Sequence, residues 1–336
     1  MTEKLKFEKA AEQTCNCLSI NNGKKVVIVT DLSKEFFAKE LANKILGKGA
    51  SLSYFVMEHY GKRPYKLPEI IFDGFKNADS GIMIFEPLKG ELELFRQPIY
   101  ELPSKTKKLR LATMPGITEQ ILEEGMACDF SKIEKFSKII YDLAVQTKEI
   151  KVTTKAGTNL KTLVGKYKWI MSTGIISPEI WGNIPSGEVY TTPDSIEGEV
   201  VVDGVVGGYI EKVCKNHPVK MKIKENKIIS VYCENKDLEK KVLETINEDE
   251  NASRIGEVAL GTNIFIKHLI GNTLQDEKSP GFHFANGDPL GEDTGAEWNS
   301  KTHTDYILLK PTIYFDKKIV MDNGKYLDKI LEKIEK

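Results

Sequence analysis

Residues 25–30, Lys-Val-Val-Ile-Val-Thr, form a continuous β-branched run that is typical of a buried strand. Asp31-Leu32-Ser33 follows at once and predicts the start of a helix, with Ser33 as its capping residue. Residues 35–46 then carry apolar side chains at helical spacing. A buried strand that leads directly into a helix predicts an α/β fold.

The same alternation continues through the first 150 residues. Further strands are predicted at 51–57, 80–85 and 109–113, and further helices at 68–77, 118–124 and 133–149. Alternating strands and helices favour a doubly wound, mostly parallel sheet, so residues 1–150 are predicted to form an α/β domain of the Rossmann or flavodoxin kind. Phosphate binding is not expected there, because the turn after the first strand has no glycine and the chain has no G-x-G-x-x-G or G-x-x-x-x-G-K-[ST] motif.

From Ile150 the pattern changes to short strands between turns rich in Gly, Asn and Asp. The predicted strands are 150–154, 161–164, 198–203, 219–223, 227–232 and 257–260, and one helix is predicted at 236–246. Short strands joined by such turns favour antiparallel pairing. Residues 151–336 are therefore predicted to form an α+β domain.

Composition narrows the class of protein. The chain has 336 residues, of which 40% are hydrophobic and 29% charged, as expected for a globular protein with two domains. Lys and Arg (48) nearly balance Asp and Glu (49), so no nucleic-acid partner is expected. No apolar run approaches the ~20 residues that span a bilayer, and the charged N-terminus lacks a signal core, which predicts a cytoplasmic protein without a membrane partner. The five scattered cysteines are predicted to be reduced thiols.

Residues 302–305, Thr-His-Thr-Asp, place two potential metal ligands in a predicted strand. Since a strand has a period of two, His303 and Asp305 leave the same face. His283 lies upstream, after a Pro-Gly turn that would allow Glu277 to reach the same point. Histidines and carboxylates that converge from several segments are typical of a divalent metal site.

Two further glutamates are candidate ligands because of the residues around them. In residues 255–261 two apolar side chains suit a core, whereas Glu257 shares the opposite face with Ala259 and Gly261, which suggests a pocket. Glu188 lies in a turn-rich segment that is predicted to present it from a loop.

Six side chains are thus candidate metal ligands: Glu188, Glu257, Glu277, His283, His303 and Asp305. Four carboxylates in one pocket would carry about four negative charges and repel one another strongly. Two divalent cations would neutralise them and leave positions for a bridging water and a substrate.

Four segments resemble the thermophilic metallo-aminopeptidase family, the aminopeptidase T/S group (peptidase family M29). They are 183–193 (NIPSGEVYTTP), 255–261 (IGEVALG), 276–287 (DEKSPGFHFANG) and 302–305 (THTD). Weaker similarity at 78–81 and 155–160 extends the resemblance over most of the chain.

The resemblance implies a homodimeric hydrolase that removes N-terminal residues from small peptides. It also implies that the six candidate ligands hold two divalent ions (zinc, cobalt or magnesium), and that Glu257 or Glu277 accepts the proton of the activated water. The chain is shorter than the better-known members. The family usually places a tyrosine after His283 that could stabilise the oxyanion, and residues 284–290 contain none.

Two other functions stay open. The fold also resembles dioxygenases that cleave dihydroxypyridine rings with one Fe(II), for which His283, His303 and Asp305 would form a two-histidine, one-carboxylate triad. A third possibility is a non-catalytic member of the fold, with or without a metal kept as structure. The dinuclear hydrolase is preferred because it uses all six residues, whereas the oxygenase leaves three glutamates without a role.

Overall fold

The computed structural model describes two compact units. The described residues are 3–63, 66–88, 90–208, 210 and 212–334. Unit 1 consists of Met1–Ser131 and Thr173–Ser186, and unit 2 of Lys132–Ser172 and Gly187–Lys336. A boundary at residue 150 between independently folding domains stays a prediction.

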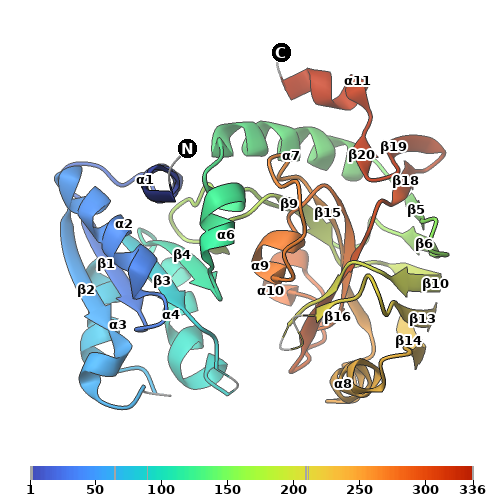
Figure 1. The fold of residues 1–336 in the computed structure, drawn as a ribbon, viewed down its shortest axis with the longest axis horizontal. Coiled ribbons are helices and arrows are strands. Elements are labelled where there is room, and N and C mark those ends of the chain that lie inside the picture. Colours follow the sequence, from blue (N-terminus) through green and yellow to red (C-terminus); the bar gives the residue numbers. More distant parts are fainter. Residues whose placement is uncertain (1–2, 64–65, 89, 209, 211, 335–336) are drawn as a thin grey trace. The chain divides into compact units, whose positions relative to one another are not determined.

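Unit 1 is built on a five-stranded parallel sheet of order β2-β1-β3-β4-β8. The strands are β1 (Lys25–Thr30), β2 (Ser51–Val56), β3 (Ser80–Phe85), β4 (Arg110–Pro115) and β8 (Trp181–Asn183). The helices are α1 (Glu3–Cys17), α2 (Glu35–Gly47), α3 (Glu69–Asn77), α4 (Gln97–Tyr100), α5 (Leu102–Thr106) and α6 (Glu119–Ile121) (Figure 1). The predicted α/β class with a parallel sheet is confirmed.

Local details of unit 1 differ from the sequence prediction. Helix α2 begins at Glu35 without a side-chain cap, so the predicted cap at Ser33 is wrong. The reason is that the Asp31 carboxylate accepts hydrogen bonds from the Ser33 hydroxyl (2.6 Å) and the Lys34 amide (3.0 Å). The predicted helix at 133–149, most of which belongs to unit 2, begins earlier, at Phe130, and ends at Ala144, before the next strand begins at Glu149.

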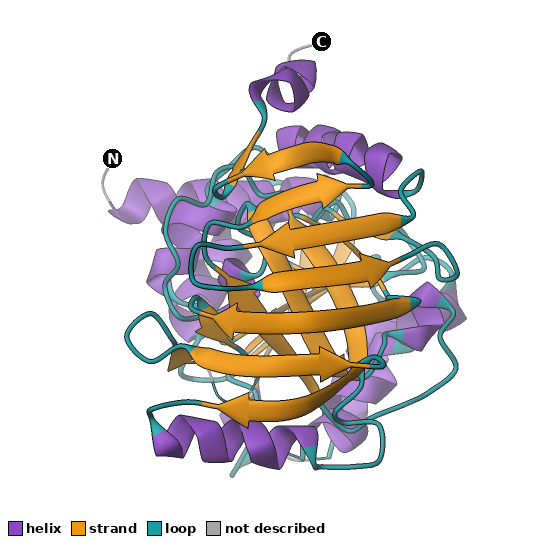
Figure 2. Cartoon of the chain, turned by 90° about the vertical axis from the view of Figure 1, so that its right-hand side faces the viewer, coloured by secondary structure: helices purple, strands orange, loops and turns teal. Residues whose placement is uncertain are grey.

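Unit 2 contains two antiparallel sheets that cross face to face (Figure 2). The eight-stranded sheet has the order β14-β13-β10-β6-β5-β18-β19-β20, and the seven-stranded sheet has the order β12-β11-β17-β16-β15-β9-β7. The first sheet contains β5 (Glu149–Thr153), β6 (Asn159–Leu163), β10 (Ser195–Val202), β13 (Val219–Lys224), β14 (Lys227–Tyr232), β18 (Thr312–Phe315), β19 (Lys318–Asp322) and β20 (Lys325–Tyr326). The second contains β7 (Ile170–Ser172), β9 (Glu188–Thr191), β11 (Val205–Val206), β12 (Lys212–Val213), β15 (Ile255–Gly261), β16 (Gly281–Gly287) and β17 (His303–Leu308).

Helices complete unit 2. They are α7 (Phe130–Ala144), which begins two residues earlier in unit 1, α8 (Lys236–Ile246), α9 (Thr273–Asp276), α10 (Gly291–Thr294) and α11 (Asp328–Leu331). Helix α8 lies along the β14 edge of the eight-stranded sheet (Figure 2). The predicted antiparallel α+β region is confirmed.

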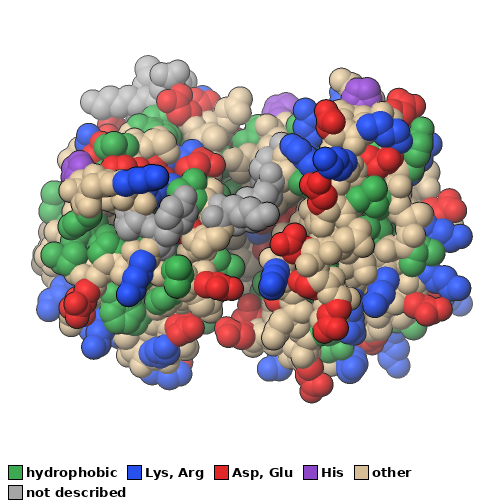
Figure 3. Space-filling model, turned by 90° about the horizontal axis from the view of Figure 1, so that it is seen from below, with side chains coloured by type: hydrophobic (Ala, Val, Ile, Leu, Met, Phe, Trp, Pro, Cys, Tyr) green, Lys and Arg blue, Asp and Glu red, His purple; other side chains and the backbone are tan. Residues whose placement is uncertain are grey.

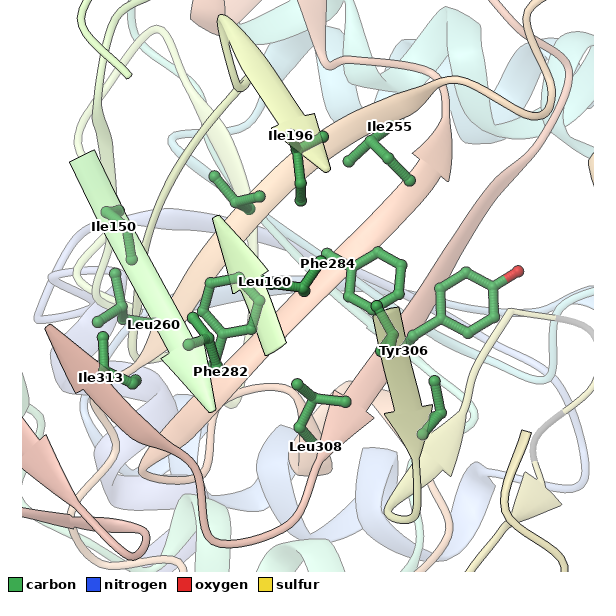
Figure 4. Packing of buried hydrophobic residues seen from close by; sticks show 14 of the residues in the cluster. Ile150, Leu160, Ile196, Ile255, Leu260, Phe282, Phe284, Tyr306, Leu308 and Ile313 are labelled. Atoms are coloured by element: carbon green, nitrogen blue, oxygen red, sulfur yellow. The ribbon is translucent and has the colours of Figure 1, made fainter. Parts of the chain in front are cut away.

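The core of unit 2 lies between the two sheets (Figure 4). Alternate residues of β15, β16 and β17 point into it, among them Leu260, Phe282, Phe284 and Tyr306, which are at most 1% exposed. The intervening residues of the same strands therefore lie on the opposite face of the seven-stranded sheet.

Charged side chains of both signs are intermixed on the surface in Figure 3, in agreement with the near-balanced composition. Among the described residues, no helix combines the length and the apolar character needed to cross a membrane.

Candidate metal centre

Four neighbouring strands contribute candidate ligands to the face of the seven-stranded sheet that points away from the core. Glu188 begins β9, Glu257 lies on β15, His283 on β16, and His303 and Asp305 on β17. In the strand register Glu188 pairs with Gly261, Glu257 with Ala285, and Ala285 with Asp305. Because strand side chains alternate between faces, all five side chains leave the same face, here called the site face.

The loop after α9 brings the sixth candidate, Glu277, to the same place. A Cβ on Gly261 would lie 1.8 Å from the Ser279 carbonyl oxygen, so the loop main chain crosses β15 where that strand has no side chain. Glu277, His283 and Asp305 consequently offer ligand atoms within 4.8 Å of one another. The space beside Glu257 that the sequence assigns to a pocket is therefore occupied at Gly261 by main chain.

Both histidines face carboxylates through Nε2. His283 Nε2 lies 3.3 Å from Glu257 Oε1 and 3.5 Å from Glu188 Oε2. His303 Nε2 lies 3.4 Å from Glu257 Oε2 and 3.6 Å from Asp305 Oδ1. His303 Nδ1 donates a hydrogen bond to the Asp288 carbonyl oxygen (2.9 Å), which directs the Nε2 lone pair of the neutral ring towards the carboxylates.

These separations fit a divalent ion. Two ligands at 2.0–2.2 Å from one tetrahedral ion lie about 3.3–3.6 Å apart, which is the spacing observed here and is longer than a hydrogen bond. Glu188 Oε2 and His283 Nε2 are buried and have no hydrogen-bond partner. Buried polar atoms without partners are costly, and an ion between them would satisfy both.

A buried lysine that the sequence interpretation overlooked also lies in the cluster. Lys278 is 2% exposed, and its Nζ lies 2.5 Å from Glu188 Oε1 and 2.6 Å from Glu277 Oε1. Burial lowers the pKa of Lys278, but these two carboxylates outweigh burial and raise it, so the side chain is an ammonium.

The carboxylates shift the pKa values of the other groups as well. Burial opposes the charged form of both histidines, yet Glu257 with Glu188 raises the pKa of His283 to about 9, and Asp305 with Glu257 raises that of His303 to about 10. Burial raises the pKa of Glu277 although the Lys278 charge opposes the change. The excess of negative charge on the site face thus stabilises any cation that enters it.

Tyr190 places a phenol on the same face. It follows Glu188 by two residues on β9, pairs with Ala259, which in turn pairs with His283, and is 7% exposed. Its hydroxyl donates a hydrogen bond to Asp293 Oδ2 (3.1 Å) on α10. Burial, followed by the charges of Asp293, Glu257 and Glu188, raises the pKa of Tyr190.

The structure thus brings all six predicted residues together, with one local difference. Glu188 is the first residue of a strand and does not lie in the predicted loop. The histidines outside the set, His59, His217 and His268, are exposed. Asp276 is adjacent to Glu277, but its carboxylate accepts hydrogen bonds from the backbone amides of residues 270–272 and is not part of the ligand cluster.

The fold and the site define a mixed α/β protein with a buried histidine–carboxylate cluster on an antiparallel sheet. The sequence model of the family "Thermophilic metalloprotease (M29)" matches residues 131–306, more than half of the chain. The chain belongs to this family. No curated protein matches the sequence significantly.

Two solved structures share the fold over nearly the whole length. 2,5-Dihydroxypyridine dioxygenase from Pseudomonas putida KT2440 superimposes with a TM-score of 0.73 at 15% identity, covering 98% of this chain and 99% of that one. Wild-type AmpT from Thermus thermophilus superimposes with a TM-score of 0.69 at 18% identity, covering 97% and 100%. The predicted resemblance to the metallo-aminopeptidase family is confirmed as family membership. The predicted resemblance to the ring-cleaving dioxygenases is confirmed as similarity of fold.

Proposed function

We propose that this protein is a metal-dependent aminopeptidase. The observation that carries the proposal is the convergence of two histidines and four carboxylates on one buried sheet face, at spacings that fit ligands of a divalent ion. Membership in the M29 metalloprotease family supports hydrolysis of a peptide bond. The fold shared with AmpT agrees with this choice.

The six side chains suit a dinuclear centre. Ligand atoms group as Glu188, Glu257 and His283, and as Glu277, His283 and Asp305. Each Glu257 oxygen faces a different histidine, so this carboxylate is suited to bridge two ions. Bound zinc, cobalt or magnesium ions would supply a bridging water of lowered pKa and polarise the scissile carbonyl.

The remaining chemistry falls to the chain's own side chains. Glu277 is assigned as the proton acceptor because burial raises its pKa, which makes its carboxylate a stronger base. Tyr190, held by Asp293, provides a hydroxyl on the site face. When substrate binds, the hydroxyl is proposed to exchange Asp293 for the carbonyl oxygen of the substrate as its acceptor, the task of the tyrosine that is absent after His283. The cytoplasmic location and the homodimer stay predictions of the sequence.

A second candidate function is a mononuclear Fe(II) ring-cleaving dioxygenase. His283, His303 and Asp305 all lie within the cluster, and three such ligands are the set that iron oxygenases use. The peptidase is preferred because the glutamates would have no task in the oxygenase.

The decisive experiment combines metal analysis with a peptide panel. Protein purified without chelator is expected to contain zinc, cobalt or magnesium, and to release amino acids from free peptides but not from N-acetylated ones. His303→Ala should lose at least one ion and at least about 10³-fold in kcat/KM, whereas the exposed control His217→Ala should retain both metal and activity. Full hydrolysis by His303→Ala would refute the site, and one iron with oxygen-dependent ring cleavage would establish the alternative. Protein that retains no metal would be a non-catalytic member of the fold.

A further inference from the structure

We propose that Lys278 is a built-in cation of the metal centre, which competes with one of the two metal ions and makes their positions unequal. This inference rests on the proposed dinuclear centre and concerns how that centre fills. One position is accessible to a metal ion at once, and the other fills only when the Lys278 ammonium leaves its carboxylates.

The main chain fixes Lys278 in place. Its amide donates to the Gln275 carbonyl oxygen (3.0 Å), and its carbonyl oxygen accepts from the Asn263 amide (2.9 Å). The contact between Ser279 and Gly261 holds the following residue against β15. The side chain therefore enters the cluster from an anchored backbone, and its position is part of the fold.

The carboxylate oxygens are divided between Lys278 and the space for an ion. Glu188 Oε1 lies 2.5 Å from Lys278 Nζ, whereas Glu188 Oε2 has no hydrogen-bond partner and faces His283. Glu277 gives Oε1 to Lys278 at 2.6 Å. An ion among Glu188 Oε2, Glu257 and His283 leaves both lysine contacts intact, whereas an ion that binds Glu277 Oε1 competes with the ammonium for the oxygen that Lys278 contacts.

The charge balance leads to the same order of filling. When two ions occupy the centre, both histidines bind as neutral ligands, and the two divalent ions balance the four carboxylates. The second ion would give a net charge of about +1 while Lys278 remains charged, but would give neutrality if residue 278 had no charge. Lys278 thus favours a centre that holds one ion tightly and a second one weakly.

Metal counting tests the proposal without reference to catalysis. Metal-free protein is titrated with Zn²⁺, and the ions per chain and their affinities are measured by calorimetry and, after gel filtration, by elemental analysis. The native chain is expected to retain about one ion and to show a second, weaker step. Lys278→Met, which keeps the length of the side chain but removes its charge, should strengthen the second step at least about tenfold and retain about two ions.

Lys161→Met is the matched control, because Lys161 is exposed on the eight-stranded sheet and should leave both steps unchanged. If Lys278→Met does not fold, the native titration still decides, since two equal steps would overturn the proposal. Unchanged steps in Lys278→Met, or no Zn²⁺ binding by the native protein, would also overturn it. Binding of two unequal ions without peptide cleavage would refute the aminopeptidase but not the role of Lys278. Peptide cleavage by protein that binds two equivalent ions would refute the role of Lys278 but not the aminopeptidase.

Discussion

The two faces of the seven-stranded sheet are both largely buried but are chemically opposite. On the core face Phe284 and Tyr306 are 0% exposed, and their rings stack with centroids 5.0 Å apart. On the site face Glu257 and His283 are 4% and 1% exposed. Burying apolar side chains stabilises a fold, whereas burying charges that outnumber their partners destabilises it. Adjacent residues on one strand therefore serve different ends: one face holds the fold together, and the other holds a site for a cation.

The largest expected effect is the pH dependence of metal binding, which only the site face should show. In the metal-free protein His283 and His303 have pKa values of about 9 and about 10, so both are protonated at neutral pH. Each ion that binds one of these rings must displace one proton. Rising pH should therefore strengthen each Zn²⁺ binding step by about tenfold per pH unit between pH 6 and 8. Competition with a chromophoric chelator measures this slope, and a pH-independent affinity would show that the histidines are not ligands.

The next largest effect is on the free energy of unfolding, which single substitutions on the two faces should change by different amounts. Phe284→Ala on the core face should lower the free energy of unfolding by about 3–5 kcal/mol, because it leaves a cavity between the sheets. Glu257→Gln on the site face keeps the shape of the side chain and leaves no cavity, but it removes the carboxylate next to two protonated histidines, so at neutral pH the metal-free protein should lose less stability than Phe284→Ala does. Urea denaturation with chelator present compares the variants. A loss of several kcal/mol in Glu257→Gln would mean that this carboxylate serves the fold.

The division between the faces could be predicted from the sequence, because it follows from the period of two. Val258 and Glu257 already separate into core and charged faces in the sequence, and His303 and Asp305 fall together by the same rule. The rule also applies to Tyr190, two residues after Glu188, but the turn-rich segment before Glu188 hides the start of β9.

Lys278 could not be placed in this way. It lies in a loop without periodicity, and its position depends on a close approach between Ser279 and Gly261, which are distant in sequence. A glycine on the same strand face as a charged residue, such as Gly261 with Glu257, predicts space beside the charge. Only the tertiary structure shows whether main chain or a ligand fills that space. For the same reason β8, three residues that return to the sheet of unit 1, has too little pattern to be predicted.

The smallest effects come from removing one hydroxyl on each face. The Tyr306 hydroxyl donates to Asn286 Oδ1 (2.7 Å) inside the core, so Tyr306→Phe leaves a buried amide oxygen unpaired and should cost about 1–3 kcal/mol of stability with kcat unchanged. The Tyr190 hydroxyl donates to Asp293, whose carboxylate is exposed and can be solvated by water when the hydroxyl is removed.

Tyr190→Phe should therefore leave stability nearly unchanged while kcat falls about tenfold or more, since a hydrogen bond to the substrate oxygen is lost when charge develops on it. The free energy of unfolding and the kcat of peptide hydrolysis are measured for both variants, and each substitution is expected to change only one of the two. If Tyr190→Phe loses stability and keeps its kcat, the phenol belongs to the fold, and the site face must obtain its hydroxyl elsewhere. If both variants lose activity equally, the two faces are coupled through the strands, and the separation of their tasks fails.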